Sequence, residues 1–168
     1  MNWFFLTVGY SGLAPKAPGT VGSLVALPLG VLILAYLGPQ TLFLTAVLLT
    51  LAGIKAVNTY QKASGTHDDS RIVIDELVGM WLALSIAPGL FTPLDELFIL
   101  ENGMLLQIVL SFVFFRYFDI KKPSIIGRID REAPGGYGVM FDDVVAGISA
   151  GILTAIVWQG IVASGLLS

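Results

Sequence analysis

Five carboxylates stand where apolar stretches of this 168-residue chain begin or end. They are Asp75 and Glu76 before one stretch, Asp142 and Asp143 before another, and Asp119 after a third. Ionisable groups at such positions are costly and indicate function, although an acid at a helix start also interacts favourably with the helix dipole. That second explanation fails for Asp119, which stands at a helix end. Clustered carboxylates repel one another unless a cation joins them, and oxygen ligands suit a hard divalent ion, so these acids predict a catalytic Mg²⁺ site.

The first apolar stretch opens with residues suited to holding an anion. Glycine lets the backbone approach a ligand closely, and the free N–H groups of a helix start attract phosphate. Hydroxyl donors and one base complete the segment, and the predicted phosphate-binding residues are Lys16, Gly19, Thr20 and Ser23. Taken in isolation, these residue types are more typical of an ordinary helix start, so the phosphate role depends on the rest of the chain.

Two later connections supply further groups for phosphate chemistry. Arg116 and Lys122 can neutralise phosphate oxygens, although basic loops also follow from membrane topology and from attraction to anionic lipids. His67, the single histidine of the chain, can protonate a departing alcohol, and Asp130 is the alternative proton donor. A lone histidine in a loop more often has no such role.

Composition excludes most soluble classes of protein. Hydrophobic residues make up 55% of the chain, charged residues make up 12%, and the mean hydropathy is +0.84, whereas a soluble domain carries about 25% charged residues. We therefore expect an integral membrane protein, not a disordered chain or a nucleic-acid binder. The lack of cysteine excludes thiolate nucleophiles, and a single histidine excludes multi-histidine metal sites. The alternative is a soluble protein with unusually buried helices.

Five apolar stretches predict an all-α, polytopic membrane bundle of about five spans, forming one domain over residues 1–168. They are Val21–Leu37, Thr41–Val57, Leu77–Phe91, Gly103–Phe118 and Val144–Leu166. Most are near the short end of what crosses a hydrocarbon core of about 30 Å. The aromatic segment Trp3–Tyr10 is too short to cross, and we expect it to lie at the membrane interface.

The distribution of charge predicts the orientation of the bundle. With five spans, all nine Lys and Arg residues fall on one side of the membrane, and the charged residues on the other side are all acids. Cytoplasmic loops are the ones enriched in Lys and Arg. We therefore expect the N-terminus and the active site to face the cytoplasm and the C-terminus to lie outside.

Four segments carry motifs that are far more specific together than singly. They are APGTVGS at 17–23, HDDSRIVIDELVGMW at 67–81, FRYFDIKKP at 115–123 and GGYGVMFDDVVAG at 135–147. In this order they resemble the phosphatidylglycerophosphatase A family over nearly the whole chain. The resemblance implies a Mg²⁺-dependent phosphatase of the bacterial inner membrane, which converts phosphatidylglycerophosphate to phosphatidylglycerol and phosphate. Soluble relatives look like compact helical bundles, which keeps a partly immersed bundle as an alternative.

The resemblance and the residue chemistry meet at the same side chains. Mg²⁺ and the basic residues would neutralise the phosphate of an anionic phospholipid while water or an acid attacks phosphorus. A membrane alcohol phosphotransferase is the nearest alternative enzyme, but its Asp-Gly…Ala-Arg spacing is absent. A cation carrier or channel is the non-enzymatic alternative, and it would need more polar groups at the centres of the spans.

Overall fold

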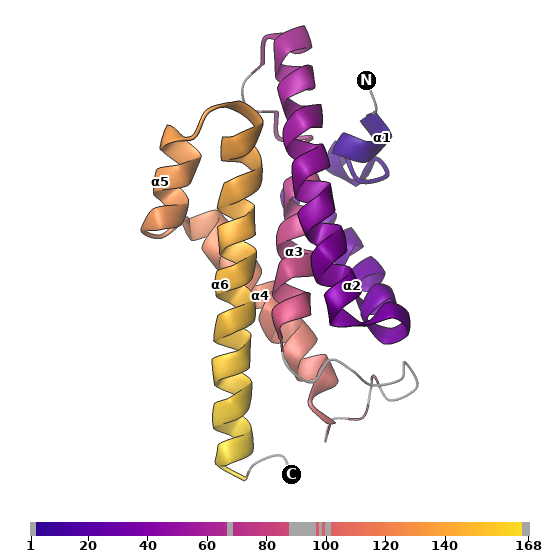
Figure 1. Ribbon diagram of the computed structural model, residues 1–168, viewed down its shortest axis with the longest axis vertical. Coiled ribbons are helices and arrows are strands. Elements are labelled where there is room, and N and C mark those ends of the chain that lie inside the picture. The colour runs from indigo at the N-terminus through magenta and orange to yellow at the C-terminus, as the bar shows by residue number, and fades with distance from the viewer. Residues whose placement is uncertain (1–2, 67–68, 88–96, 98, 100–101, 166–168) are drawn as a thin grey trace.

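The computed structural model describes residues 3–66, 69–87, 97, 99 and 102–165, and these contain helices and no strand. This finding confirms the predicted all-α class. The helices are α1 (Trp3–Leu6), α2 (Pro18–Ser64), α3 (Ile74–Ile86), α4 (Met104–Lys121), α5 (Ile125–Glu132) and α6 (Gly135–Ala163), with a 3₁₀ turn η1 at Ser11–Leu13 (Figure 1). α3 is the most buried helix and packs between α2 and α6.

α2 consists of two helical arms, because the chain turns back at Gly38 (Figure 1). Gly38 has φ 82° and ψ 167°, a conformation that glycine adopts readily and that interrupts the helix. On the first arm, the Ala26 carbonyl oxygen accepts a hydrogen bond from Nε1 of Trp81 in α3 (2.8 Å). On the second arm, the Asn58 side-chain oxygen accepts one from the Gly136 N–H of α6 (2.8 Å). Each arm is therefore tied to another helix by its own hydrogen bond.

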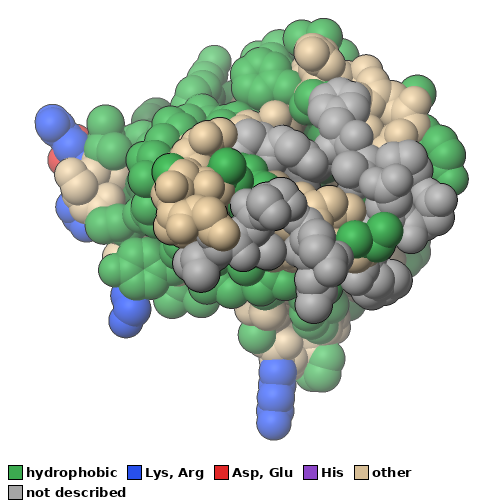
Figure 2. All heavy atoms as spheres, turned by 90° about the horizontal axis from the view of Figure 1, so that it is seen from below, with side chains coloured by type: hydrophobic (Ala, Val, Ile, Leu, Met, Phe, Trp, Pro, Cys, Tyr) green, Lys and Arg blue, Asp and Glu red, His purple; other side chains and the backbone are tan. Residues whose placement is uncertain are grey.

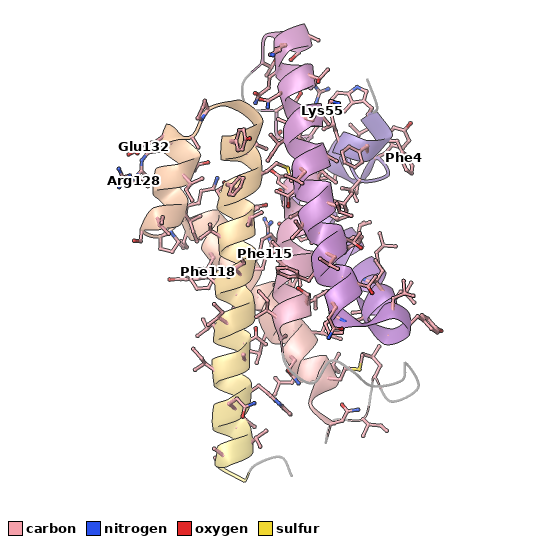
Figure 3. The ribbon with its side chains drawn as sticks, viewed as in Figure 1. Phe4, Lys55, Phe115, Phe118, Arg128 and Glu132 are labelled. Atoms are coloured by element: carbon pink, nitrogen blue, oxygen red, sulfur yellow. The ribbon has the colours of Figure 1, made fainter. Side chains whose placement is uncertain are left out.

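Glycines let α3 and α6 approach each other closely. A Cβ atom on Gly147 would overlap the carbonyl group of Gly79, and a Cβ atom on Gly79 would overlap the Phe115 ring of α4. Small residues at a crossing allow helix backbones to touch, as in membrane-helix packing. Phe115 is fully buried beside this crossing (Figure 3). The crossing therefore fixes the start of α3 against the first half of α6.

The N-terminal segment is fastened to the loop that leads into α3. The Val73 N–H donates to the Leu6 carbonyl oxygen (2.9 Å). The Arg71 guanidinium lies 5.0 Å from the centroid of the Trp3 ring, and the Tyr60 ring lies 5.2 Å from the same centroid. The structure thus gives this segment a packing role, and its location at a membrane interface stays a prediction.

In the described part of the chain, two helices, α2 and α6, are long and apolar enough to cross a membrane, judged by length and composition alone. Length and composition do not confirm the predicted count of about five spans. α3 has only 13 residues, and the two arms of α2 count as one helix. The predicted stretches Leu77–Phe91 and Val144–Leu166 also continue into residues outside the described part of the chain.

Large apolar side chains stay exposed along the outer helices. On the second arm of α2, Leu44, Leu48 and Leu51 are each more than 60% exposed, as is Ile156 on α6. So much exposed apolar surface indicates an interaction with lipid or with another protein. Figure 2 views the end that is lower in Figure 1, where the described side chains are largely hydrophobic and Lys and Arg project only at the rim. Among the side chains that the structure describes, charged groups such as Lys55, Arg128 and Glu132 lie toward the opposite end (Figure 3).

Candidate active site

Three acids meet where the first turn of α3 lies against α6. Asp75 and Glu76 come from α3 and Asp143 from α6, and each offers a carboxylate oxygen within 4.8 Å of the others. Asp143 is 3% exposed, and the other two are half-buried. The close crossing at Gly79 and Gly147 brings the helices near enough to form this cluster. The structure thus brings together three of the five predicted metal ligands.

The cluster is unfavourable as a set of bare carboxylates. Removal from water raises the pKa of Asp75, and the charge of the neighbouring Glu76 raises it further. Removal from water also raises the pKa of Glu76, to about 7. Glu76 Oε2 is buried without a hydrogen-bond partner among the described residues. A cation would stabilise the charged form of both acids.

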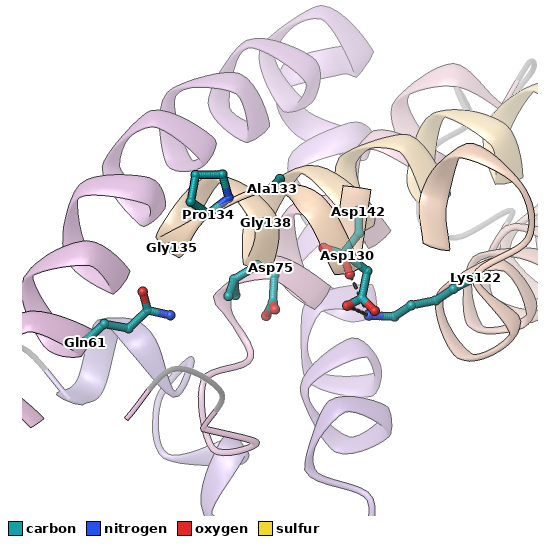
Figure 4. Close-up of a pocket in the computed structure, with 10 residues that line it drawn as sticks. Gln61, Asp75, Lys122, Asp130, Ala133, Pro134, Gly135, Gly138 and Asp142 are labelled. Atoms are coloured by element: carbon teal, nitrogen blue, oxygen red, sulfur yellow. Dashed lines mark hydrogen bonds and ion pairs between the residues drawn. The ribbon is translucent and has the colours of Figure 1, made fainter. Parts of the chain in front are cut away.

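Lys122 joins two other acids beside the cluster. Its ammonium donates to Asp142 Oδ2 at 2.7 Å and also to Asp130 Oδ1 (Figure 4). Burial alone would lower the pKa of Lys122, but the hydrogen bonds to Asp130 and Asp142 outweigh it and raise the pKa. Lys122 follows the last residue of α4 and has a left-handed conformation, φ 43°. Asp142 thus pairs with an ammonium in this structure, and its predicted role as a metal ligand stays a prediction.

Arg116 connects α4 to the start of α2. Its Nη1 lies 2.7 Å from Asp119 Oδ2 and donates to Ser23 Oγ at 3.1 Å, while Nη2 donates to Thr20 Oγ1 at 3.2 Å. Arg116 Nε is buried without a partner among the described residues. The hydroxyls predicted to bind phosphate therefore lie beside a guanidinium that has a free donor. Asp119 pairs with this guanidinium, so its predicted metal role also stays a prediction.

Gly19 lets the start of α2 reach the acid cluster. A Cβ atom at this position would overlap Oε1 of Glu76, and it would lie 3.6 Å from Nη1 of Arg116. The glycine is therefore needed for close approach between the α2 backbone and a carboxylate, not for an unusual backbone conformation. This contact gives the predicted Gly19 site residue a place in the site.

A cavity of about 300 Å³ lies among these groups. The predicted site residues that line it are Gly19, Asp75, Glu76, Arg116, Asp119, Lys122, Asp142 and Asp143. Oxygen-only donors suit Mg²⁺, and the cluster of three carboxylates includes one buried oxygen without a partner among the described residues. The residues present therefore fit a hard divalent cation with a phosphate beside it.

The remaining predicted residues differ in how they relate to the cavity. Thr20 and Ser23 accept hydrogen bonds from Arg116, which lines the cavity. Asp130 accepts one from Lys122, which also lines it. Lys16 is exposed and is not among the described residues that line the cavity. The predicted proton donor His67 lies outside the described residues.

A family model described as Phosphatidylglycerophosphatase A matches residues 4–158. The chain belongs to this family. The match covers the cavity and nearly all of the described helices, and it stops within the last turns of α6. The sequence resemblance is therefore confirmed.

Curated relatives agree with this assignment. Phosphatidylglycerophosphatase A of Escherichia coli (strain K12) is 39% identical over 153 residues, covering 90% of this chain and 81% of that protein. Phosphatidylglycerophosphatase A of Haemophilus influenzae is 37% identical over 149 residues, covering 88% and 83%. A Bacteroides thetaiotaomicron protein with the provisional name phosphatidylinositol-3-phosphatase is 38% identical over 151 residues, covering 87% and 86%. No solved structure matches the chain significantly.

Some residues around the site of this phosphatidylglycerophosphatase A family member were missed by sequence reasoning. Asp69 lines the cavity and pairs with Arg71, and the Tyr60 hydroxyl donates to its carboxylate. Asn58 holds the Gly136 N–H at the start of α6. The signal for Asp69 was its place in the 67–81 motif, whereas Asn58 stands just past an apolar stretch with no motif to mark it.

Proposed function

We propose that this protein is a Mg²⁺-dependent phosphatidylglycerophosphatase of the bacterial cytoplasmic membrane. It hydrolyses the terminal phosphate of phosphatidylglycerophosphate and leaves phosphatidylglycerol. The observation that carries the proposal is one cavity in which the cluster of Asp75, Glu76 and Asp143 faces Arg116. Family membership favours hydrolysis over the alternatives of alcohol phosphotransfer or cation transport.

Asp75, Glu76 and Asp143 are the residues we assign to hold Mg²⁺. Their carboxylate oxygens are close enough to share one ion, and Glu76 has a buried oxygen free for it. When bound, the ion supplies Lewis-acid stabilisation of negative charge on the phosphate. Asp119 and Asp142 line the same cavity and hold Arg116 and Lys122.

Arg116 binds and orients the phosphate in this proposal. Its guanidinium is oriented by Asp119, Ser23 and Thr20, which leaves Nε as a buried donor without a described partner. A planar guanidinium suits phosphate oxygens because it presents several donors at once. The free N–H groups at the start of α2 add positive potential on the same side of the cavity.

The remaining steps are nucleophilic attack on phosphorus and proton transfer, and side chains of the chain itself take part in both. A cavity carboxylate accepts a proton from the attacking water, or attacks phosphorus itself in a two-step route. Asp130 or His67 donates a proton to the departing alcohol. Asp130 is 43% exposed on its side chain and is held by Lys122, so it lies at the edge of the site and not at its centre.

We further propose that the helices form a multi-pass membrane bundle of about five spans, with the N-terminus and the active site on the cytoplasmic side. The exposed leucines of α2 and the exposed apolar residues of α6 suit contact with lipid. Each arm of α2 would then cross separately, because the chain turns back at Gly38. The basic residues gather toward the end that holds the site, as expected for a cytoplasmic face.

Phosphate release by the purified protein tests the proposed function. With Mg²⁺ and mixed micelles of phosphatidylglycerophosphate, we expect inorganic phosphate and phosphatidylglycerol in equal amounts. Phosphatidylinositol 3-phosphate serves as a second substrate because one relative is named for it. Transfer of the phosphate to an added alcohol, or no release from phosphatidylglycerophosphate, would contradict the proposal.

A further inference from the structure

A second cavity of about 380 Å³ adjoins the first (Figure 4). The two cavities share Asp75, Lys122, Val139 and Asp142 in their walls. Beyond these shared residues, the second cavity is walled by Asp130, by Gln61 of α2, by Gly138 and by the turn 133–135 that leads into α6 (Figure 4). The second cavity therefore offers space beside a phosphate held in the first.

The charges in the second cavity disfavour another phosphate. Its one ammonium, on Lys122, is already bound by two carboxylates, on Asp130 and Asp142, and Asp75 adds a third acid. The cavity thus has no uncompensated positive charge for an anion. The four charged side chains in its wall also make it unsuited to an acyl chain, because an apolar chain would leave these groups without polar partners.

Asp142 provides an independent sign of what the second cavity holds. It is 4% exposed, and while Oδ2 accepts from Lys122, Oδ1 is buried without a partner among the described residues. A buried acceptor without a donor is rare in folded proteins and calls for a partner. A hydroxyl group meets this need because it donates to a carboxylate and accepts from an ammonium through the same oxygen.

We propose that the second cavity is a polyol site, which binds the hydroxylated alcohol that carries the scissile phosphate. Asp142 Oδ1 accepts a hydrogen bond from the free hydroxyl group of this alcohol. Lys122, oriented by Asp130, donates to the oxygen of the same hydroxyl at the boundary between the two cavities. This inference rests on the proposed function, because the first cavity must hold the phosphate. It identifies the polyol, and not the lipid chains, as the part of the substrate that this protein selects.

The test compares two lipids that differ by one hydroxyl group. One is phosphatidylglycerophosphate, and the other is its analogue with propane-1,3-diol in place of glycerol. A site built to hydrogen-bond a hydroxyl rejects the analogue that lacks it by large factors, so we expect kcat/KM to be at least about 100-fold lower for the analogue. Equal kcat/KM values would overturn the polyol site and leave the proposed function intact, whereas hydrolysis of neither lipid would overturn both.

Variants then test whether Asp130 contributes to this selection. We expect Asp130→Ala to narrow the ratio of the two kcat/KM values about tenfold or more, because Lys122, which donates to the hydroxyl oxygen, loses a partner that orients it. An equal fall on both lipids would overturn this assignment and make Asp130 a proton donor only. Glu132→Gln is the matched control on the same helix, because Glu132 pairs with Arg128 on the exposed side of α5 (Figure 3) and should leave the ratio unchanged.

A soluble measurement on the wild-type protein avoids any effect of a variant on folding. Glycerol 3-phosphate and propyl phosphate carry the same phosphate but differ in hydroxyl groups. We expect glycerol 3-phosphate to inhibit phosphate release at a concentration at least about tenfold lower than propyl phosphate. Equal inhibition by the two compounds would contradict a hydroxyl-binding second cavity.

Discussion

Asp142 and Asp143 are consecutive in α6, yet their carboxylates have different partners. Asp143 joins Asp75 and Glu76 in the acid cluster, whereas Asp142 accepts a hydrogen bond from Lys122 Nζ at 2.7 Å. Successive residues of an α-helix point roughly 100° apart, so one helix can present one acid to a metal site and the next to an ammonium. The pair thereby divides the region into a metal side and a lysine side.

This division predicts different metal binding for two matched variants. Asp143→Asn should lower Mn²⁺ affinity at least about tenfold and lower kcat about 10²–10⁴-fold, because Lewis-acid stabilisation supplies several kcal/mol. Asp142→Asn should leave Mn²⁺ affinity within about threefold, because its main partner is Lys122. Titration followed by electron paramagnetic resonance measures the affinities without turnover. A loss of Mn²⁺ binding in Asp142→Asn would instead place that residue among the ligands.

Removal of divalent ions should abolish activity reversibly. We expect EDTA to stop phosphate release and excess Mg²⁺ to restore it. Ca²⁺ should restore it poorly, because it takes more ligands at longer distances than Mg²⁺ does. Circular dichroism in EDTA checks that the helices persist. Undiminished activity after exhaustive chelation would exclude a metal role for the acid cluster.

Gly19→Ala should disturb the acid cluster without unfolding the protein. The added Cβ overlaps the end of the Glu76 side chain, which can rotate away, and it leaves the surrounding backbone free of overlap. We expect about a tenfold loss of kcat/KM or more, with the Mg²⁺ concentration for half-maximal activity raised, because Glu76 moves. Ala17→Gly, just before the helix, is a suitable control. Full activity of the Gly19→Ala protein would show that catalysis does not depend on Glu76.

The Asp69 carboxylate should stabilise the loop before α3 in a pH-dependent way. The hydrogen bond from Arg71 holds the pKa of Asp69 well below its usual range, although burial opposes this shift. A depressed folded-state pKa means that the stabilisation is complete above the ordinary value of 3.8 and is lost as pH falls below it. At pH 7, Asp69→Asn should therefore lower the free energy of unfolding by about 1 kcal/mol, and it should lower the Tm accordingly. The difference in Tm between the variant and the wild type should shrink below pH 4. A constant difference between pH 3 and pH 7 would show that the carboxylate charge is not responsible.

Reporter fusions test the proposed orientation. A reporter after Ser168 should be outside the cytoplasm, and one inserted at Ser64 or Ile126 should be inside, because the basic loops stay in the cytoplasm. A phosphatase reporter and a fluorescent reporter are active on opposite sides of the membrane, so together they show on which side each fusion lies. A C-terminus in the cytoplasm would mean that the count of spans is wrong by one.

The sequence by itself determined the helical class, the apolar stretches and the candidate site residues. These are local properties: an apolar fraction of 55% and acids placed next to apolar stretches are visible without any knowledge of packing. The motif at 67–81 likewise marked Asp75 and Glu76 because they adjoin an apolar helix. Local patterns also indicated a break between the first two stretches, and the structure has it at Gly38.

Tertiary structure alone decided which of these residues act together. Arg116 meets Ser23 across 93 positions of the chain, and Asp143 meets Asp75 because α3 and α6 cross at two glycines. The partner of each acid depends on how far its helix is rotated and how closely its neighbour approaches. Those quantities are fixed by packing between distant segments. The sequence around the adjacent residues Asp142 and Asp143 therefore does not indicate that Asp143 lies in an acid cluster and Asp142 beside a lysine.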